Sequence, residues 1–283
     1  MSDQEQTSKT ILVAIDGSQA SQSAARTAIQ IAKKQGLKVH GLYVVDEVLV
    51  LDRYANYRLE LGEEVEEPSN GQIIDLFEKQ GSQAIEWLEN QCFKVEVPVI
   101  TEMLFGGVEE LVVEKSKEAA LLALGRHGHG HEQDAFHLGR MFRHIAHHSR
   151  APVLVGGERS DSIHRLLLAY DGTNKAKRAL AWTSKLQRAL QCQVVVISVS
   201  QDEYAFQEWI VEMRTDIESS DLTNYRFESR EGEPAKEIVA TAEEEHADLI
   251  LAGKYEHSAF VDWIIGSTLD HVLQKTPLPL IAA

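Results

Sequence analysis

The feature that most constrains the fold of this chain is an internal repeat. A strand-like run at residues 9–15 ends in Asp16-Gly17-Ser18, and another at residues 164–170 ends in Asp171-Gly172-Thr173, 155 positions later (171 − 16). After each run, apolar residues recur three or four positions apart, which is the spacing of an amphipathic helix. The repeat indicates two copies of one folding unit within a single polypeptide.

Each copy continues as strands that alternate with helices. Further strands are expected at residues 39–45, 95–101, 120–124 and 152–155 of the first copy, and at 194–199, 225–229, 248–252 and 278–282 of the second. Later helices are expected at residues 108–117, 138–147, 234–244 and 267–274. Nearly continuous apolar strands separated by helices predict a parallel sheet covered on both faces. The expected fold is therefore α/β, with two tandem doubly wound domains, each with a mainly five-stranded parallel sheet flanked by helices.

The repeat also predicts the domain boundaries. Residues 1–157 form the expected first domain, residues 164–283 the second, and the short polar segment 158–163 the linker. The offset between the copies falls from 155 to 127 (266 − 139), so the first copy carries 28 extra residues (155 − 127). Most of them are expected between residues 46 and 80, where the acidic stretch 60–67 is expected to form a solvated loop or a partner-facing segment.

The composition is that of an ordinary globular protein, with 43% apolar and 25% charged residues in a chain of 283, long enough for two domains. A formal charge of −16 opposes binding to nucleic acid. The first ten residues are polar, and the longest apolar runs fall far short of the roughly 20 residues that cross a membrane. We therefore expect a cytoplasmic protein without membrane contact, in which Cys92 and Cys192 are buried, unpaired thiols.

Three features of each copy resemble the universal stress protein family, and together they cover nearly the whole chain twice. They are Asp-Gly-Ser or Asp-Gly-Thr after the first strand, an aliphatic-Val pair late in the second strand, and a glycine loop after the fourth. The resemblance implies a role in stress response and a small anionic ligand, such as ATP or another adenine nucleotide with magnesium. It also implies that the last strands of the two copies pair, which gives an intramolecular pseudo-dimer with buried sheet edges. Further homodimerisation and the identity of any protein partner stay open.

In nucleotide-binding relatives the glycine loop reads G-x2-G-x9-G-[ST], where backbone N–H groups and the hydroxyl approach phosphates. In the first copy the matching residues would be Asp16, Val44, Gly125, Gly128, Gly139 and Arg140. In the second copy they would be Asp171, Val199, Gly253, Gly266 and Ser267. Asp16 and Val44, or Asp171 and Val199, would then flank adenine or ribose.

Neither loop matches the pattern fully. Ten residues rather than nine separate Gly128 from Gly139, and Arg140 stands where Ser or Thr is expected, although an arginine can itself grip a phosphate. The second loop keeps its spacing but carries Glu256 at the second glycine position. A carboxylate about 4 Å from a phosphate charge costs roughly 4 kcal/mol at an effective dielectric constant of 20. The first copy, whose loop region also holds Arg126, Arg143 and Arg150, is therefore the favoured nucleotide site.

Two other interpretations of the chain compete with nucleotide binding. Seven of the twelve histidines lie between positions 127 and 148, which raises the hypothesis of a metal-responsive protein. Because structural zinc sites usually contain cysteine at a recognisable spacing, and neither occurs here, we predict no metal site and regard zinc as disfavoured. The degenerate loops alternatively fit an interaction scaffold without a ligand.

Asp16 and Asp171 also allow a catalytic or a purely structural reading. Asp-Gly-Ser and Asp-Gly-Thr are good turn and helix-start sequences, so binding or turn bracing is favoured over catalysis. The sequence shows no Ser-His-Asp order, no paired catalytic carboxylates and no P-loop. We therefore expect no dedicated enzyme, and at most slow hydrolysis of ATP.

Overall fold

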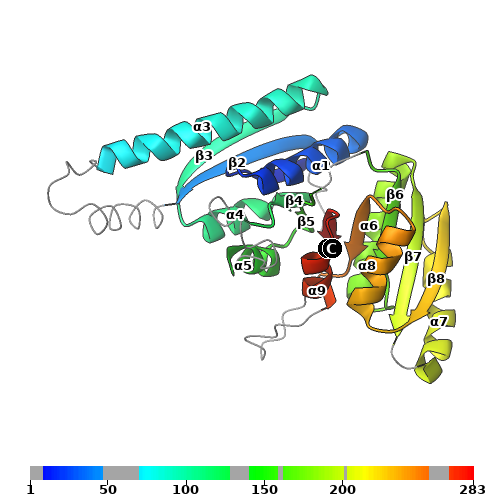
Figure 1. Cartoon of the computed structure of the whole chain (residues 1–283). Coiled ribbons are helices and arrows are strands. Elements are labelled where there is room, and N and C mark those ends of the chain that lie inside the picture. Colours follow the sequence, from blue (N-terminus) through cyan, green and yellow to red (C-terminus); the bar gives the residue numbers. More distant parts are fainter. Residues whose placement is uncertain (1–8, 47–69, 128–139, 159–161, 201–202, 255–267) are drawn as a thin grey trace, which may run out of the picture.

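In the computed structural model the chain forms one ten-stranded sheet that is covered by helices on both faces (Figure 1). The structure describes residues 9–46, 70–127, 140–158, 162–200, 203–254 and 268–283. The N-terminal half contains β1 (Thr10–Ala14), α1 (Gln19–Gln35), β2 (Lys38–Asp46), α3 (Asn70–Lys94), β3 (Val99–Gly106), α4 (Val108–Ser116), β4 (Leu121–Leu124), α5 (Arg140–His148) and β5 (Val153–Val155). The C-terminal half contains β6 (Arg165–Ala169), α6 (Asn174–Leu190), β7 (Gln193–Ser200), α7 (Glu203–Glu218), β8 (Tyr225–Glu231), α8 (Pro234–Glu244), β9 (Leu249–Ala252), α9 (Thr268–Lys275) and β10 (Leu280–Ala282).

The strand order is β3-β2-β1-β4-β5-β10-β9-β6-β7-β8, so the second half repeats the first in reverse across the centre of the sheet. Within each half all described strand pairs are parallel, as the sequence predicts. The two halves join through β5 and β10, which pair antiparallel with Leu154 opposite Ile281. The predicted five-stranded sheets and the intramolecular pseudo-dimer are thus confirmed, and the C-terminal end of the chain lies at the middle of the sheet (Figure 1).

Local sequence fixes where the first helix of each half begins. The hydroxyl of Ser18 accepts a hydrogen bond from the backbone N–H of Ser21 at 3.1 Å, and Thr173 accepts one from Ala176 at 3.2 Å. These are helix N-caps, which satisfy backbone donors that the first turn leaves unpaired. Because each cap directly follows a parallel strand, the N-termini of α1 and α6 lie at the carboxyl edge of the sheet.

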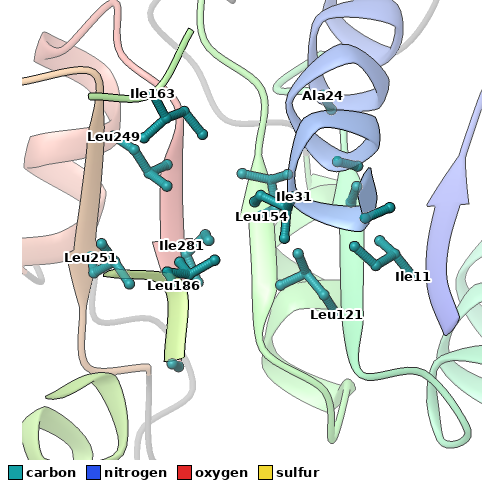
Figure 2. Packing of buried hydrophobic residues seen from close by; sticks show 14 of the residues in the cluster. Ile11, Ala24, Ile31, Leu121, Leu154, Ile163, Leu186, Leu249, Leu251 and Ile281 are labelled. Carbon is teal, nitrogen blue, oxygen red and sulfur yellow. The ribbon is translucent and has the colours of Figure 1, made fainter. Parts of the chain in front are cut away.

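The apolar core consists of two layers, one on each face of the sheet. Successive strand residues point to opposite faces, so Ile11 and Val13 belong to the layer under α1 and α3 while Leu12 belongs to the layer under α4 and α5. Each layer continues through both halves, with α6 and α7 on the first face and α8 and α9 on the second. Figure 2 shows part of the first layer, including the paired residues Leu154 and Ile281. The two halves therefore share both core layers.

The structure corrects one detail of the expected strand and helix pattern, the start of the third strand. Residues 70–80, at the end of the segment expected to hold most of the extra residues of the first copy, belong to α3, which continues to Lys94. The third strand consequently starts at Val99 rather than at residue 95, after a turn in which Glu96 has a left-handed φ of 60°. The acidic stretch 60–67 lies outside the described residues.

Two further expectations concern the thiols and the membrane. Cys92 and Cys192 are both buried and unpaired, as predicted. Within the part of the chain that the structure describes, no helix is both long enough and apolar enough to span a membrane.

Candidate functional site

A pocket of about 240 Å³ lies at the carboxyl ends of the strands in the C-terminal half. It borders β6, which lies between β9 and β7, so it marks the place where the strand order reverses. Open α/β sheets bind ligands at this switch point. Asp171, Val199 and Gly253, three residues predicted from the sequence, all line the cavity, which we call the switch-point pocket.

The walls of the switch-point pocket are largely apolar, with a few polar groups. Strand residues Ile197 and Ile250 form part of the lining, and helices α8 and α9 contribute Ile238, Leu269 and Val272. The lining residues with polar side-chain groups are Tyr170, Asp171, Thr173, Lys175 and Thr268. An apolar cavity with a few convergent polar groups is typical of a small-molecule site. Its volume lies just below the roughly 300–1,000 Å³ typical of ligand pockets, which suits a nucleoside-sized group.

The aspartate of each half braces the turn that enters the first helix. Asp171 Oδ1 accepts hydrogen bonds from the backbone N–H and the hydroxyl of Thr173, at 3.1 and 2.6 Å. Asp16 Oδ1 likewise accepts one from the N–H of Ser18 at 2.9 Å. The bracing role expected from Asp-Gly-Ser and Asp-Gly-Thr is therefore present in both turns. Asp171 is exposed and also lines the pocket, so bracing leaves its carboxylate accessible to a ligand.

Tyr170 supports the same turn from inside the protein. Its hydroxyl donates to Asp216 at 2.9 Å, and Lys177 lies 3.2 Å from that carboxylate. Burial, followed by the hydrogen bond to Asp216, raises the pKa of the Tyr170 phenol, which therefore stays neutral and keeps donating. The backbone carbonyl of Tyr170 accepts from buried Ser198 of β7 at 2.6 Å. These contacts fix the β6–α6 turn against β7 and α7.

The first glycine of each predicted phosphate loop has a packing role. A Cβ atom on Gly125 would lie 2.8 Å from the backbone nitrogen of Ser21, and one on Gly253 would lie 2.7 Å from Cβ of Lys175. Glycine at both positions therefore lets the loop approach the first turn of α1 or α6. This requirement holds with or without a nucleotide, so these two glycines alone do not indicate phosphate binding.

The other predicted loop residues fall mostly outside the described chain. Gly128 and Gly139 of the first loop, and Glu256, Gly266 and Ser267 of the second, are not described. Arg140 is the first residue of α5, but its side chain is outside the description. Asp16, Val44 and Gly125 lie at the carboxyl ends of β1, β2 and β4, the counterparts of the strands that form the switch-point pocket. The prediction that the N-terminal half binds the nucleotide is therefore not tested.

Arg126 does not have the role that the sequence suggests. Its guanidinium was expected to belong to a basic island near the phosphate loop, but it is bound to backbone carbonyls, most of them in the C-terminal half. In α5, the Nε of Arg143 is shielded from solvent and has no hydrogen-bond partner among the described residues. A side chain with such an unsatisfied donor fits an anionic ligand in the N-terminal half.

Three histidines of the sequence cluster interact within α5. His144 stacks on His148 with ring centroids 4.1 Å apart, and His147 meets His148 edge-on with centroids 5.0 Å apart. The Nδ1 of His144 lies 3.4 Å from Glu109 Oε2. Across the described ranges, no group of three or more His, Cys, Asp or Glu side chains is arranged to hold a metal ion. His129, His131 and His137 are outside those ranges, so the metal hypothesis stays untested there.

Comparison with known proteins decides the family. The model of the universal stress protein family matches the chain twice, over residues 7–155 and 162–283. The chain belongs to the universal stress protein family. Members are grouped as stress-response proteins, and the double match confirms the tandem arrangement.

Individual universal stress proteins align over much of the chain. One from Synechocystis sp. is 25% identical over 301 aligned positions, which cover 96% of this chain and 99% of the relative. Another, from Methanocaldococcus jannaschii, is 30% identical over 149 positions, 52% of this chain and 81% of the relative. The crystal structure of a universal stress protein from Archaeoglobus fulgidus shares the fold with a TM-score of 0.74 and 20% identity, covering 97% of this chain and 98% of that one.

Proposed function

We propose that this universal stress protein is a cytoplasmic regulator that binds an adenine nucleotide or a related anionic ligand, whose nucleoside part occupies the switch-point pocket. The proposal rests on one observation: residues from the ends of three strands meet in one cavity. Asp171, Val199 and Gly253 follow or end three different strands, and they meet in one apolar cavity of nucleoside size. The aspartate supplies an acceptor for a ribose hydroxyl or an exocyclic amine, and the apolar walls suit a planar base.

Among the described residues, Lys175 gives the pocket a positive charge that fits the phosphates, while Glu256 of the second loop lies outside the described residues. Lys175 lies in the first turn of α6, where the helix N-terminus itself favours negative charge. A nucleotide placed with its base among Ile197, Ile250 and Leu269 would direct its phosphates toward this side of the pocket. Magnesium would accompany the phosphates when the ligand is ATP. The equivalent site of the N-terminal half, with Asp16, Val44 and Arg140, is the one that the sequence favours, and it remains a second proposed site for the same class of ligand.

Calorimetric titration of magnesium-ATP into nucleotide-stripped protein tests the proposal. Asp171→Asn keeps the oxygen that braces the turn but removes the charge, and Asp16→Asn makes the same change in the other half. Loss of a charge-assisted hydrogen bond of about 1.5–3 kcal/mol corresponds to roughly 10- to 100-fold weaker binding. We expect Asp171→Asn to weaken binding at the switch-point pocket by this amount, and Val199→Phe, which fills the pocket, to abolish binding there. Val44→Phe makes the corresponding change in the N-terminal half and tests the second proposed site.

The outcomes separate the alternatives. Weakening confined to Asp16→Asn and Val44→Phe would move the site to the N-terminal half and contradict the placement proposed here. An absence of saturable binding by the wild-type protein would contradict nucleotide binding altogether and favour the interaction scaffold.

A further inference from the structure

Arg126 forms a bridge from the N-terminal half to the C-terminal half. It follows Gly125 at the end of β4, and its Nε donates to the carbonyl of Gly156 at 2.8 Å. The two terminal nitrogens reach into the other half and donate to the carbonyls of Leu273, Thr276 and Leu278 at 2.5–2.9 Å. Although burial lowers the pKa of this guanidinium, arginine remains protonated in proteins. One fixed cation thus satisfies four backbone acceptors.

The acceptors in the C-terminal half lie at the end of a helix that forms a wall of the switch-point pocket. Leu273 belongs to the last turn of α9, and Thr276 follows that helix directly. Leu269 and Val272, one turn earlier in α9, line the pocket. The last carbonyls of a helix lack partners within the helix and carry its negative dipole, so a bound cation holds this end in place. The position of the α9 wall therefore depends on a side chain from the other half.

Lys254 makes the reciprocal contact in the opposite direction. It follows Gly253, a wall residue of the pocket, and its ammonium group donates to the carbonyls of Ser149 and Ala151 just after α5. These acceptors correspond to Thr276 and Leu278 with the same offset of 127 positions (276 − 149 and 278 − 151). The contacts of Arg126 and of Lys254 are therefore equivalent, and the pseudo-twofold symmetry of the chain relates them.

We infer that Arg126 is a positioning residue of the switch-point pocket, and that Lys254 transmits occupancy of this pocket to the C-terminal end of α5. The inference rests on the proposed function of the pocket. A ligand that contacts both Gly253 and α9 would affect both sets of contacts, because Lys254 follows Gly253 and Arg126 binds the end of α9. Because α5 begins at Arg140, a residue of the proposed site in the N-terminal half, the contact of Lys254 links the two proposed sites.

The test compares variants that change one cation at a time. Arg126→Lys keeps the charge but loses the planar fork that reaches several carbonyls together. Arg165→Lys is the matched control, because Arg165 also donates to a backbone carbonyl, that of Glu245, but within one half and away from the pocket. Lys254→Met removes the reciprocal donor. Circular dichroism at the working temperature shows that each variant is folded before it is used.

Two measurements are made on the full chain: the dissociation constant of magnesium-ATP, and hydrogen–deuterium exchange of peptides from α5 and α9. In Arg126→Lys we expect about tenfold weaker binding and faster exchange in α9, both absent in Arg165→Lys. In the wild-type protein, ATP should slow exchange in α9 and in the last turn of α5. In Lys254→Met, the response of α5 should be lost.

Failure of this inference and failure of the proposed function give different results. If the wild-type protein binds ATP but Arg126→Lys matches it in affinity and in α9 exchange, the positioning role is wrong and the proposed function stands. An α5 response that persists in Lys254→Met overturns the transmission through this residue. If no ATP binds, the proposed function fails. Hydrogen–deuterium exchange of α9 in ligand-free Arg126→Lys then tests whether Arg126 positions α9. An exchange rate equal to that of the wild type overturns this role.

Discussion

Gly157→Ala is expected to destabilise the protein where the two halves pack against each other. Gly157 is buried after β5, and its carbonyl accepts a hydrogen bond from the hydroxyl of Ser23. A Cβ atom at this position would lie 2.5 Å from the carbonyl carbon of Leu278 and 2.5 Å from the carbonyl oxygen of Pro277. Both atoms belong to the backbone of the other half, and ordinary contacts with a Cβ begin at 3.4 Å.

The expected cost follows from these distances. The alanine methyl requires the backbone before β10 to move by about 1 Å (3.4 − 2.5). That backbone cannot yield easily, because Arg126 binds the carbonyls of Thr276 and Leu278 and the N–H of Glu158 binds Pro277. Overpacking of a well-filled core usually costs about 1–3 kcal/mol, and a clash with backbone belongs at the upper end. We expect the free energy of unfolding to fall by about 3 kcal/mol and the melting temperature by roughly 6 °C.

Urea and thermal unfolding, followed by circular dichroism, measure the effect. Gly107→Ala is the matched control, since a Cβ there would meet the carboxylate of Glu110, the movable end of a flexible side chain. Neither glycine has φ in the left-handed region, so backbone strain does not separate the two variants. If Gly157→Ala unfolds within about 1 kcal/mol of both the wild type and Gly107→Ala, the close packing of the halves at this point is wrong.

Two further predictions concern buried titratable groups. Burial raises the pKa of Cys92 and of Cys192 to about 11, two units above the ordinary 9.0. At pH 8 the folded protein should therefore react with a thiol-specific disulfide reagent at least about 100-fold more slowly than the urea-unfolded protein, and equal rates would contradict this. Burial, together with the positive charge of Arg178, lowers the pKa of Lys254 from 10.5 to about 8, so the unfolded chain binds more protons between these pH values. The free energy of unfolding of the wild type, relative to Lys254→Met, should therefore rise between pH 8 and 10.5 by at most about 3 kcal/mol in urea titrations, whereas a constant difference would refute the shift.

The sequence predicts those parts of the fold that local patterns determine. Apolar strands mark a parallel sheet in each half, and the proline of α8 starts that helix at the expected residue, Pro234. The bounds of helices α3 and α7 were not predicted. The late start of β3 follows from the same omission, since α3 extends to Lys94 and displaces the strand.

The candidate site was predictable to a similar extent. Topology alone brings the strand ends together, so the convergence of Asp171, Val199 and Gly253 on one pocket agrees with the sequence prediction of which residues share a site. The apolar walls from α8 and α9 could not be distinguished from core residues, because Ile238 and Val272 have the same amphipathic spacing as any buried helix face. Arg126 was misassigned for another reason. Three of its four partners are backbone carbonyls about 150 positions away, which leave no trace in side-chain identity.

Fusion of the two copies in one chain has a consequence that a symmetric dimer of identical subunits could not have. In such a dimer the cation after the first loop glycine would be the same residue on both sides. Here it is Arg126 on one side, with four carbonyl acceptors, and Lys254 on the other, with two. The guanidinium keeps its charge at any physiological pH, whereas the ammonium has a pKa of about 8. The cation that holds α9 at the switch-point pocket therefore keeps its charge, while the cation that binds the end of α5 loses its charge as the pH rises past about 8, so the two halves depend on each other unequally.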